Sequence, residues 1–181
     1  NTEPSIGSVS LESNESDTSV GYEGSTLSCN PQSSSDIDGD NISYAYAWYI
    51  NSSPISAQSQ TITGSQFDKG NTVYCEATPS DGMDTGLTVA SNSIVISNTA
   101  PSLDTVSVSP NPAYEGSSLS CVLGTASDDD GDGVSYIYDW TVNGSALGFA
   151  STTSVALTGS NFNKGDDVAC VVTPTDGYDQ G

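Results

Sequence analysis

Residues 22–29 read Tyr22-Glu23-Gly24-Ser25-Thr26-Leu27-Ser28-Cys29, and the chain repeats them almost unchanged as Tyr114-Glu115-Gly116-Ser117-Ser118-Leu119-Ser120-Cys121. Self-similarity at a fixed period is the signature of a tandem repeat, in which each copy is one structural unit. The sequence therefore predicts two copies of one domain.

The repeat continues downstream of this stretch. At the same offset Asp36-Ile37-Asp38-Gly39-Asp40 returns as Asp128-Asp129-Asp130-Gly131-Asp132, and Trp48 returns as Trp140. At a slightly larger offset Cys75 returns as Cys170, and a Thr-Pro-x-Asp-Gly segment returns at the end of both copies, as Thr78-Pro79-Ser80-Asp81-Gly82 and Thr173-Pro174-Thr175-Asp176-Gly177.

The start of the chain also recurs, which places the domain boundary. Asn1-Thr2-Glu3-Pro4-Ser5-Ile6 is similar to Asn98-Thr99-Ala100-Pro101-Ser102-Leu103, so we expect domains at 1–97 and 98–181. Gly181 precedes any second copy of the segment 87–96. If Gly181 is a true terminus, the second domain lacks its last strand, and a strand from another subunit would complete it and polymerise the chain into a filament. If the chain is a fragment, that strand follows in the sequence.

Strict alternation of apolar and polar residues predicts half-buried strands and an all-β fold. In the segment 42–50 the inward residues are Ile42, Tyr44, Tyr46, Trp48 and Ile50, and their counterparts are Val134, Tyr136, Tyr138, Trp140 and Val142. Val73, Cys75 and Ala77 alternate likewise, as do Val168, Cys170 and Val172. Gly, Ser, Thr, Asn and Asp are abundant, so helix-forming material is scarce.

Four cysteines allow three pairings, but two similar copies must each be self-consistent. This favours the disulfides Cys29–Cys75 and Cys121–Cys170. A four-cysteine metal site is disfavoured because no Cys-x-x-Cys spacing occurs. Persistent disulfides imply an oxidising, extracellular compartment.

A cysteine, an inward tryptophan and a second cysteine resemble the pattern of an immunoglobulin-like β-sandwich, with Cys29 on strand B, Trp48 on strand C and Cys75 on strand F. The Asp-x-Asp-Gly-Asp loop before Tyr-x-Tyr-x-Trp, and the late Asp-Gly turn, resemble the PKD-like and cadherin-like repeats of bacterial and archaeal surface proteins. The chain departs from the immunoglobulin pattern at Val73 and Val168, where a tyrosine is usual. The resemblance implies two tandem immunoglobulin-like sandwiches, each with one disulfide.

The charge balance excludes several partners. The chain has 23 acidic residues, two basic residues and no histidine, which gives a net charge of −21. Nucleic acids and anionic membrane surfaces would be repelled, and no apolar run is long enough to insert into a membrane. Cations suit such a surface, although the acidity could also serve solubility in a salty medium.

The acidic loops are the candidate metal sites. Carboxylates about 4 Å apart repel by roughly 4 kcal/mol at an effective dielectric of 20, and a divalent cation removes that repulsion. Calcium accepts oxygen ligands in flexible geometry. In the sandwich that the resemblance implies, the B–C and F–G loops meet at one end. The expected calcium ligands are then Asp36, Asp38, Asp40, Asp81 and Asp84 in the first copy, and Asp128, Asp130, Asp132, Asp176 and Asp179 in the second.

The acidic loops allow two other interpretations. An EF-hand is excluded because its glycine is sixth and its acidic ligand twelfth, whereas here the glycine is fourth and the twelfth residue from Asp36 is Ala47, within the predicted strand. The second alternative is that the Asp residues are solvated turn formers, because aspartate favours tight turns.

The sequence favours a non-catalytic function. It has no histidine and no phosphate-binding glycine loop, and its cysteines pair, so no nucleophile with a base is evident. We expect a calcium-stiffened structural segment of a surface protein, stalk or filament, with neighbouring repeats or other copies of itself as partners. A calcium-dependent adhesin or carbohydrate-binding module that contacts surface glycans is the alternative. Acceptor patterns for glycosylation occur at Asn14, Asn51 and Asn143.

Overall fold

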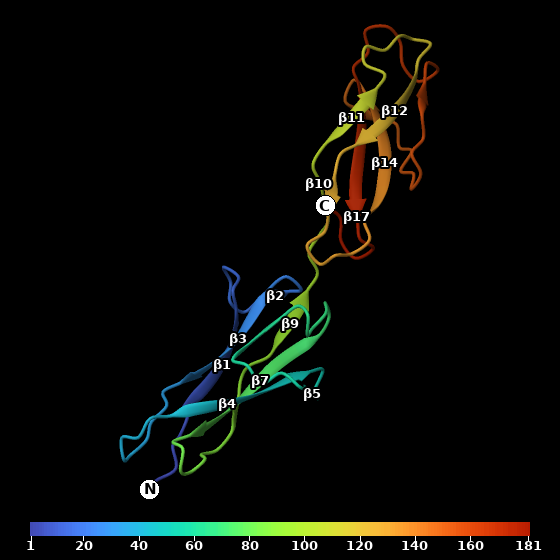
Figure 1. The fold of residues 1–181 in the computed structure, drawn as a ribbon. Coiled ribbons are helices and arrows are strands. Elements are labelled where there is room, and N and C mark those ends of the chain that lie inside the picture. The colour runs from blue at the N-terminus through green and yellow to red at the C-terminus, as the bar shows by residue number, and fades with distance from the viewer. The chain divides into compact units, whose positions relative to one another are not determined.

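The computed structural model describes residues 1–181, which form strands and turns without a helix, so the predicted all-β fold is confirmed (Figure 1). The chain divides into two compact units, Asn1–Asn98 and Thr99–Gly181, which we call unit 1 and unit 2. The division lies one residue beyond the expected boundary. No helix with the length and hydropathy of a membrane span is present.

Unit 1 contains two sheets. One has the strand order β1-β3-β6, and the other has the order β2-β9-β7-β4-β5, with β8 also paired to β7. Neighbouring strands run antiparallel except β2 and β9, which are parallel. The strands are β1 (Ser8–Ser13), β2 (Gly21–Tyr22), β3 (Thr26–Gln32), β4 (Ser43–Ile50), β5 (Ser53–Ile55), β6 (Thr61–Thr63), β7 (Thr72–Ser80), β8 (Val89–Ala90) and β9 (Ile94–Ser97).

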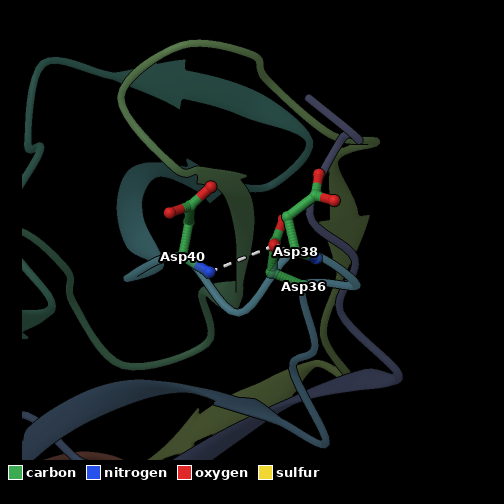
Figure 2. A group of neighbouring side chains, drawn as sticks. All are labelled: Asp36, Asp38 and Asp40. Carbon is green, nitrogen blue, oxygen red and sulfur yellow. Dashed lines mark hydrogen bonds between the residues drawn. The ribbon is translucent and has the colours of Figure 1, made fainter.

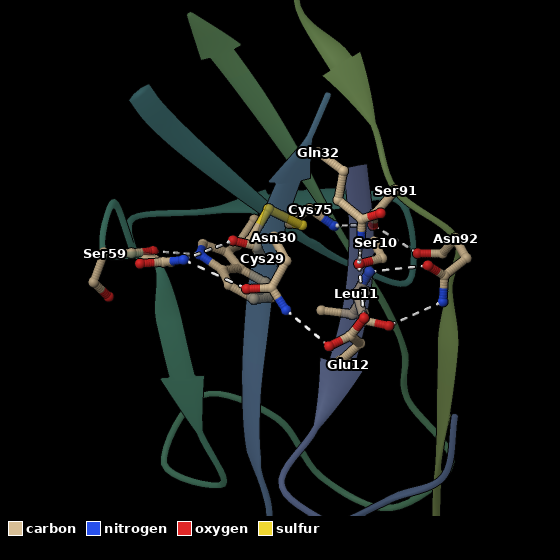
Figure 3. The surroundings of a disulfide bond; sticks show 12 residues. Ser10, Leu11, Glu12, Cys29, Asn30, Gln32, Ser59, Cys75, Ser91 and Asn92 are labelled. Carbon is tan, nitrogen blue, oxygen red and sulfur yellow. Dashed lines mark hydrogen bonds between the residues drawn. A yellow bond between two sulfur atoms is a disulfide. The ribbon is translucent and has the colours of Figure 1, made fainter. Parts of the chain in front are cut away.

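The core of unit 1 draws residues from both sheets into one hydrophobic cluster. Buried and half-buried residues alternate along β7, as the sequence predicts, because successive side chains of a strand point to opposite faces. The disulfide Cys29–Cys75 joins β3 to β7 and so links the two sheets (Figure 3). Trp48 is fully buried opposite Cys75, and its indole N–H donates to the Ser59 carbonyl at 2.8 Å.

Unit 2 repeats part of this arrangement. Its sheets have the orders β11-β12-β16 and β15-β14-β17, and a short ladder joins β10 to β13. All of these pairs are antiparallel. The strands are β10 (Ser102–Leu103), β11 (Val106–Ser109), β12 (Ser118–Leu123), β13 (Ala126–Ser127), β14 (Ser135–Val142), β15 (Ser145–Ala146), β16 (Leu157–Thr158) and β17 (Val168–Thr175).

The core of unit 2 is smaller. Its buried cluster consists of Leu119, Trp140, Leu157 and Phe162. The second predicted disulfide, Cys121–Cys170, is present, and the Trp140 indole N–H donates to the Val155 carbonyl at 2.8 Å.

Two predicted inward tyrosines of unit 2 do not join its core. All four tyrosines are half-buried, but Tyr44 and Tyr46 pack against the cluster of unit 1, whereas Tyr136 and Tyr138 lie outside the cluster of unit 2. In unit 1, Val89 of β8 also packs against the core beside β7. No strand covers that edge of β17, so the inward face of unit 2 has fewer apolar neighbours.

Candidate metal centre

The acidic loop of unit 1 lies between β3 and β4 and is organised by one carboxylate (Figure 2). Oδ1 of Asp36 accepts the backbone N–H groups of Asp38 at 2.9 Å and Asp40 at 3.2 Å. Gly39 adopts φ +83°, a conformation that side chains with a Cβ rarely take. These bonds hold the three aspartates on one tight turn.

The loop of unit 2 has the same geometry. Oδ1 of Asp128 accepts the N–H groups of Asp130 at 2.9 Å and Asp132 at 3.2 Å, and Gly131 adopts φ +80°. The two loops therefore share a hydrogen-bonding pattern as well as a sequence.

The other oxygen of the organising carboxylate is left without a partner in both units. Oδ2 of Asp36 and Oδ2 of Asp128 are buried and accept no hydrogen bond. A buried oxygen without a partner costs free energy, and the cost is greater when the group is charged. The same unsatisfied atom at the same position in both loops marks a place where a positive ligand would be stabilised.

Carboxylate oxygens gather around this position in each unit. In unit 1 the oxygens of Asp36, Asp38 and Asp40 lie within 4.8 Å of one another. In unit 2 the group consists of Asp128, Asp132 and Asp176, whose carboxylate oxygens also lie within 4.8 Å of one another. The first and last aspartates of the loop belong to the group in each unit, as Asp36 and Asp40 in unit 1 and as Asp128 and Asp132 in unit 2. These two positions form the part of the candidate site that both units share.

The second predicted segment of each site lies in the turn after β7 or β17. Asp81 accepts the N–H groups of Met83 and Asp84, each at 2.7 Å. The corresponding carboxylate, Asp176, accepts those of Tyr178 at 2.6 Å and Asp179 at 2.7 Å. Only Asp176 joins an acidic group, so the expected convergence of five carboxylates is seen in part in unit 2 and not in unit 1.

In unit 1 the side chain of Asn1 occupies the acidic turn. Its Nδ2 donates to Oδ2 of Asp81 and to Oδ2 of Asp84, each at 2.8 Å. The pKa of Asp81 lies below its ordinary value, chiefly because the Asp84 amide donates to it and then because Asn1 does. The amide of Asn1 thus takes the place at Asp81 and Asp84 that a cation could take.

The middle aspartate of each loop has a role that the sequence reasoning missed. Asp38 accepts the Thr2 N–H at 2.7 Å, and Asp130 accepts the N–H of Thr99 at 2.5 Å and its hydroxyl at 3.2 Å. Each middle carboxylate therefore fixes the segment that leads into its unit. The Asn-Thr pair that recurs at 1–2 and 98–99 is the sequence feature from which this contact could have been predicted.

The candidate glycosylation sites are exposed, and the side-chain oxygen of each asparagine accepts a hydrogen bond from a backbone N–H. Asn14 accepts the Thr26 N–H at 2.7 Å. Asn51 accepts the Thr72 N–H at 2.9 Å, and Asn143 accepts that of Asp167 at 3.0 Å. Nδ2 of Asn143, the atom that would carry a glycan, also donates to Asp166 at 2.8 Å.

Comparison with models of known protein families gives no match to this chain, and comparison with curated protein sequences gives none either. The function must therefore be argued from the site itself.

Proposed function

We propose that this chain is an extracellular, non-catalytic structural segment made of two immunoglobulin-like β-sandwich repeats, each of which binds calcium in its acidic loop. The observation that carries the proposal is the buried, unsatisfied Oδ2 of Asp36 and Asp128, which recurs at one position of both repeats.

The strand orders support the sandwich. The sheets β1-β3-β6 and β2-β9-β7-β4-β5 correspond to strands A-B-E and A′-G-F-C-C′ of an immunoglobulin-like domain. The disulfide then joins strand B to strand F, with Trp48 of strand C beside it. Unit 2 has the same order for the strands that it contains.

The donor set favours calcium among the common metals. Zinc prefers histidine nitrogen and cysteine sulfur, but the chain has no histidine and every cysteine is in a disulfide. The gathered ligands are carboxylate oxygens on a turn. Calcium takes about six to eight oxygen ligands in flexible geometry, whereas magnesium requires near-ideal octahedral geometry and gives up its water reluctantly.

Calcium would stiffen the end of a repeat. In unit 1 the loop that carries Asp36 also holds the entering segment through Asp38 and Thr2. In unit 2 the carboxylate group brings the loop and the turn after β17 together through Asp176. A cation that neutralises these carboxylates would hold segments that are distant in sequence in one arrangement, which suits a stalk or filament. The two disulfides support an oxidising, extracellular setting.

Isothermal titration calorimetry of the intact, oxidised chain with calcium, and separately with magnesium, tests this function. We expect calcium to bind at both loops and magnesium to bind more weakly. Asp36→Asn and Asp128→Asn keep Oδ1 as an acceptor for the loop amides but remove the charge, so each variant should lose one calcium site.

Asp129→Asn is the matched control, because Asp129 lies in the same loop but is exposed and outside the gathered group. It lowers the charge by the same amount and should keep both sites. If Asp129→Asn weakens calcium as much as Asp128→Asn does, binding reflects general charge and the proposal fails.

A further inference from the structure

The outward face of β4 and β7, which are neighbours in unit 1, carries two stacked tyrosines (Figure 1). Tyr49 of β4 lies opposite Tyr74 of β7, and the ring centroids are 4.6 Å apart with an interplanar angle of 2°. Trp48 and Cys75, the next residues along the two strands, are fully buried, so the tyrosines point away from the core. The ring separation is close to the strand spacing of about 4.8 Å, so the stack runs across the sheet.

This row of rings is bounded differently on its two sides. On the β5 side Pro54 lies opposite Tyr49 and continues the row. On the other side the register of β9 places the exposed Ser93, which has a small side chain, beside Tyr74. Val95 of β9 is 59% exposed, so no other element covers the sheet there. The ring face of Tyr74 that points away from Tyr49 therefore borders an open position.

A carboxylate lies next to this open position. Glu76 is two residues beyond Tyr74 on β7, so both side chains are on the same face of the sheet. The Tyr49 hydroxyl donates to Oε2 of Glu76 at 2.9 Å, which holds the side chain in place and leaves Oε1 as an acceptor. The residues opposite Glu76 on β4 and β8 are Ala47 and Ala90, which are too small to cover it.

The charge of the chain restricts what this face can bind. Acidic residues number 23 against two lysines, and neither lysine lies on β4, β7 or β9. An anionic group would be repelled by Glu76 and by the field of the whole chain. A cation is attracted by both, and a tyrosine ring face attracts a cation within about 6 Å of its centroid. Charge complementarity therefore favours a basic partner.

The shape of the position selects among basic groups. A guanidinium is planar, stacks on aromatic faces and donates to a carboxylate through a rigid fork of N–H groups. A lysine ammonium is a compact and strongly hydrated point charge, so it gains less from a flat ring face. The open position beside Tyr74 offers a flat ring on one side and the acceptor Oε1 of Glu76 nearby.

We infer that Tyr74 and Glu76 of unit 1 form a binding site for an arginine side chain on an exposed basic segment of a partner protein. The guanidinium stacks on the open face of Tyr74 and donates to Oε1 of Glu76. Tyr49 is a positioning residue, because its ring supports Tyr74 and its hydroxyl holds Glu76. Unit 2 has neither an aromatic ring nor a carboxylate at the corresponding positions, which are Thr141, Ala169 and Val171.

The test uses the full oxidised chain with two short probes, acetyl-Gly-Arg-Gly-amide and the same peptide with citrulline in place of arginine. Citrulline keeps the planar shape but has no charge. Chelator keeps metal ions away from the acidic loops, and about 0.15 M salt screens general attraction to the acidic chain. In heteronuclear NMR titrations the arginine peptide should shift the ring signals of Tyr49 and Tyr74 to saturation. The citrulline peptide should bind roughly two- to fivefold more weakly or less.

Two substitutions separate the stacking from the charge. Tyr74→Leu removes the ring face, and Glu76→Gln removes the charge but keeps an acceptor, so each should weaken the arginine peptide by roughly two- to fivefold. Glu76→Gln keeps the ring stack and so tests the site even if Tyr74→Leu disturbs the sheet. Tyr114→Leu and Glu3→Gln are the matched controls. Tyr114 is 77% exposed and outside every ring pair, and Glu3 is exposed, so both variants should bind as the natural chain does.

Several results would overturn the inference. Equal affinity for the arginine and citrulline peptides would show that charge has no part in binding, and shifts confined to the acidic loops would place the peptide elsewhere. Unchanged affinity in both Tyr74→Leu and Glu76→Gln would exclude the two residues. A neutral sugar such as methyl glucoside that shifts the same two rings more strongly than the arginine peptide would assign this face to a carbohydrate instead.

Discussion

Unit 1 and unit 2 have the same sequence pattern but bury very different parts of it. Thirteen apolar residues are buried in the cluster of unit 1, against four in that of unit 2. The two disulfides close loops of similar length, with sequence separations of 46 and 49 residues, and both tryptophans are fully buried. The difference lies at the edges, where β8 and β9 cover β7 but no strand covers the same edge of β17.

Both units share the disulfide and the buried tryptophan, which therefore specify the centre of the repeat, whereas closure of the core in unit 1 depends on β8 and β9. Val9 of β1 is 7% exposed, but Val106, its counterpart on β11, is 36% exposed. Exposure of one sheet edge therefore accompanies exposure of the opposite sheet, because burial in a two-layer fold is shared between the layers.

The largest expected effect comes from removing a disulfide from each unit. A crosslink over loops of this length contributes about 4 kcal/mol in the chain-entropy model, and nearly the same amount in both units. With its smaller core, unit 2 should unfold at room temperature in Cys121→Ala/Cys170→Ala, whereas unit 1 should stay folded in Cys29→Ala/Cys75→Ala. Circular dichroism and amide NMR of both variants would measure this, and equal survival of the two units would contradict the comparison.

A second prediction concerns a substitution that reduces the buried core of unit 1, so that it becomes more like that of unit 2. Ile96→Ala should lower the free energy of unfolding of unit 1 by about 2–5 kcal/mol, because it leaves a cavity where β9 closes the core. Val95→Ala on the same strand is the control and should cost far less, since Val95 is 59% exposed. Urea unfolding of both variants gives the difference. Equal losses would mean that β9 does not close the core through its buried side chains.

The middle aspartates provide a smaller contrast. Asp130 accepts two hydrogen bonds from Thr99 in a half-buried setting, and Asp38 accepts one from Thr2 in an exposed setting. Asp130→Ala should therefore destabilise unit 2 by about 1–2 kcal/mol, and Asp38→Ala should destabilise unit 1 by less. Chelator-treated samples should show the same order in urea unfolding, which separates this effect from metal binding.

The smallest expected effect concerns a feature that unit 2 lacks. Tyr49 stacks on Tyr74 with ring centroids 4.6 Å apart, and its hydroxyl donates to Glu76 at 2.9 Å. In unit 2 the residues that correspond to Tyr49, Tyr74 and Glu76 are Thr141, Ala169 and Val171. The hydrogen bond to Glu76, followed by desolvation and the charge of Glu76, raises the pKa of the Tyr49 hydroxyl. A raised folded-state pKa gives stability that is present below the unfolded pKa of about 10 and is lost as the pH rises through the folded pKa.

Glu76→Gln should therefore lower the Tyr49 pKa toward its ordinary value and weaken the alkaline pH dependence of unit 1. NMR titration of chain labelled in its tyrosine rings would follow the hydroxyl directly. Glu3→Gln removes the same charge from an exposed position and should leave Tyr49 unchanged. An unaltered pKa in Glu76→Gln would show that Glu76 does not control this hydroxyl.

The repeat explains how much of the structure could be predicted. Its cysteines, its alternating strands and its acidic loops are local patterns, and each pattern appears twice, so the β fold and both disulfides followed from the sequence. The absence of Tyr136 and Tyr138 from the cluster of unit 2 did not follow, because contact with the core depends on whether another strand covers the sheet edge. The spacing of residues along the chain does not show whether a strand covers that edge.

The candidate site was predicted less completely. The turns around Asp36 and Asp128 follow from Asp and Gly at fixed positions, and the turn after β7 follows for the same reason. The amide of Asn1 between Asp81 and Asp84, and the bond from Thr2 to Asp38, join segments that are far apart in sequence. Such bonds depend on side-chain placement in the folded unit, which residue spacing does not specify.

Thermal unfolding of the oxidised chain in calcium, in magnesium and in chelator at one ionic strength tests the proposed function most directly. A ligand that binds only the folded state stabilises it by about 2.7 kcal/mol at one hundred times its dissociation constant. We predict that calcium raises the melting temperature of both units, that magnesium raises it less, and that Asp36→Asn combined with Asp128→Asn removes the calcium effect. Equal melting temperatures in calcium and in chelator would contradict the account and leave both acidic loops as solvated turns.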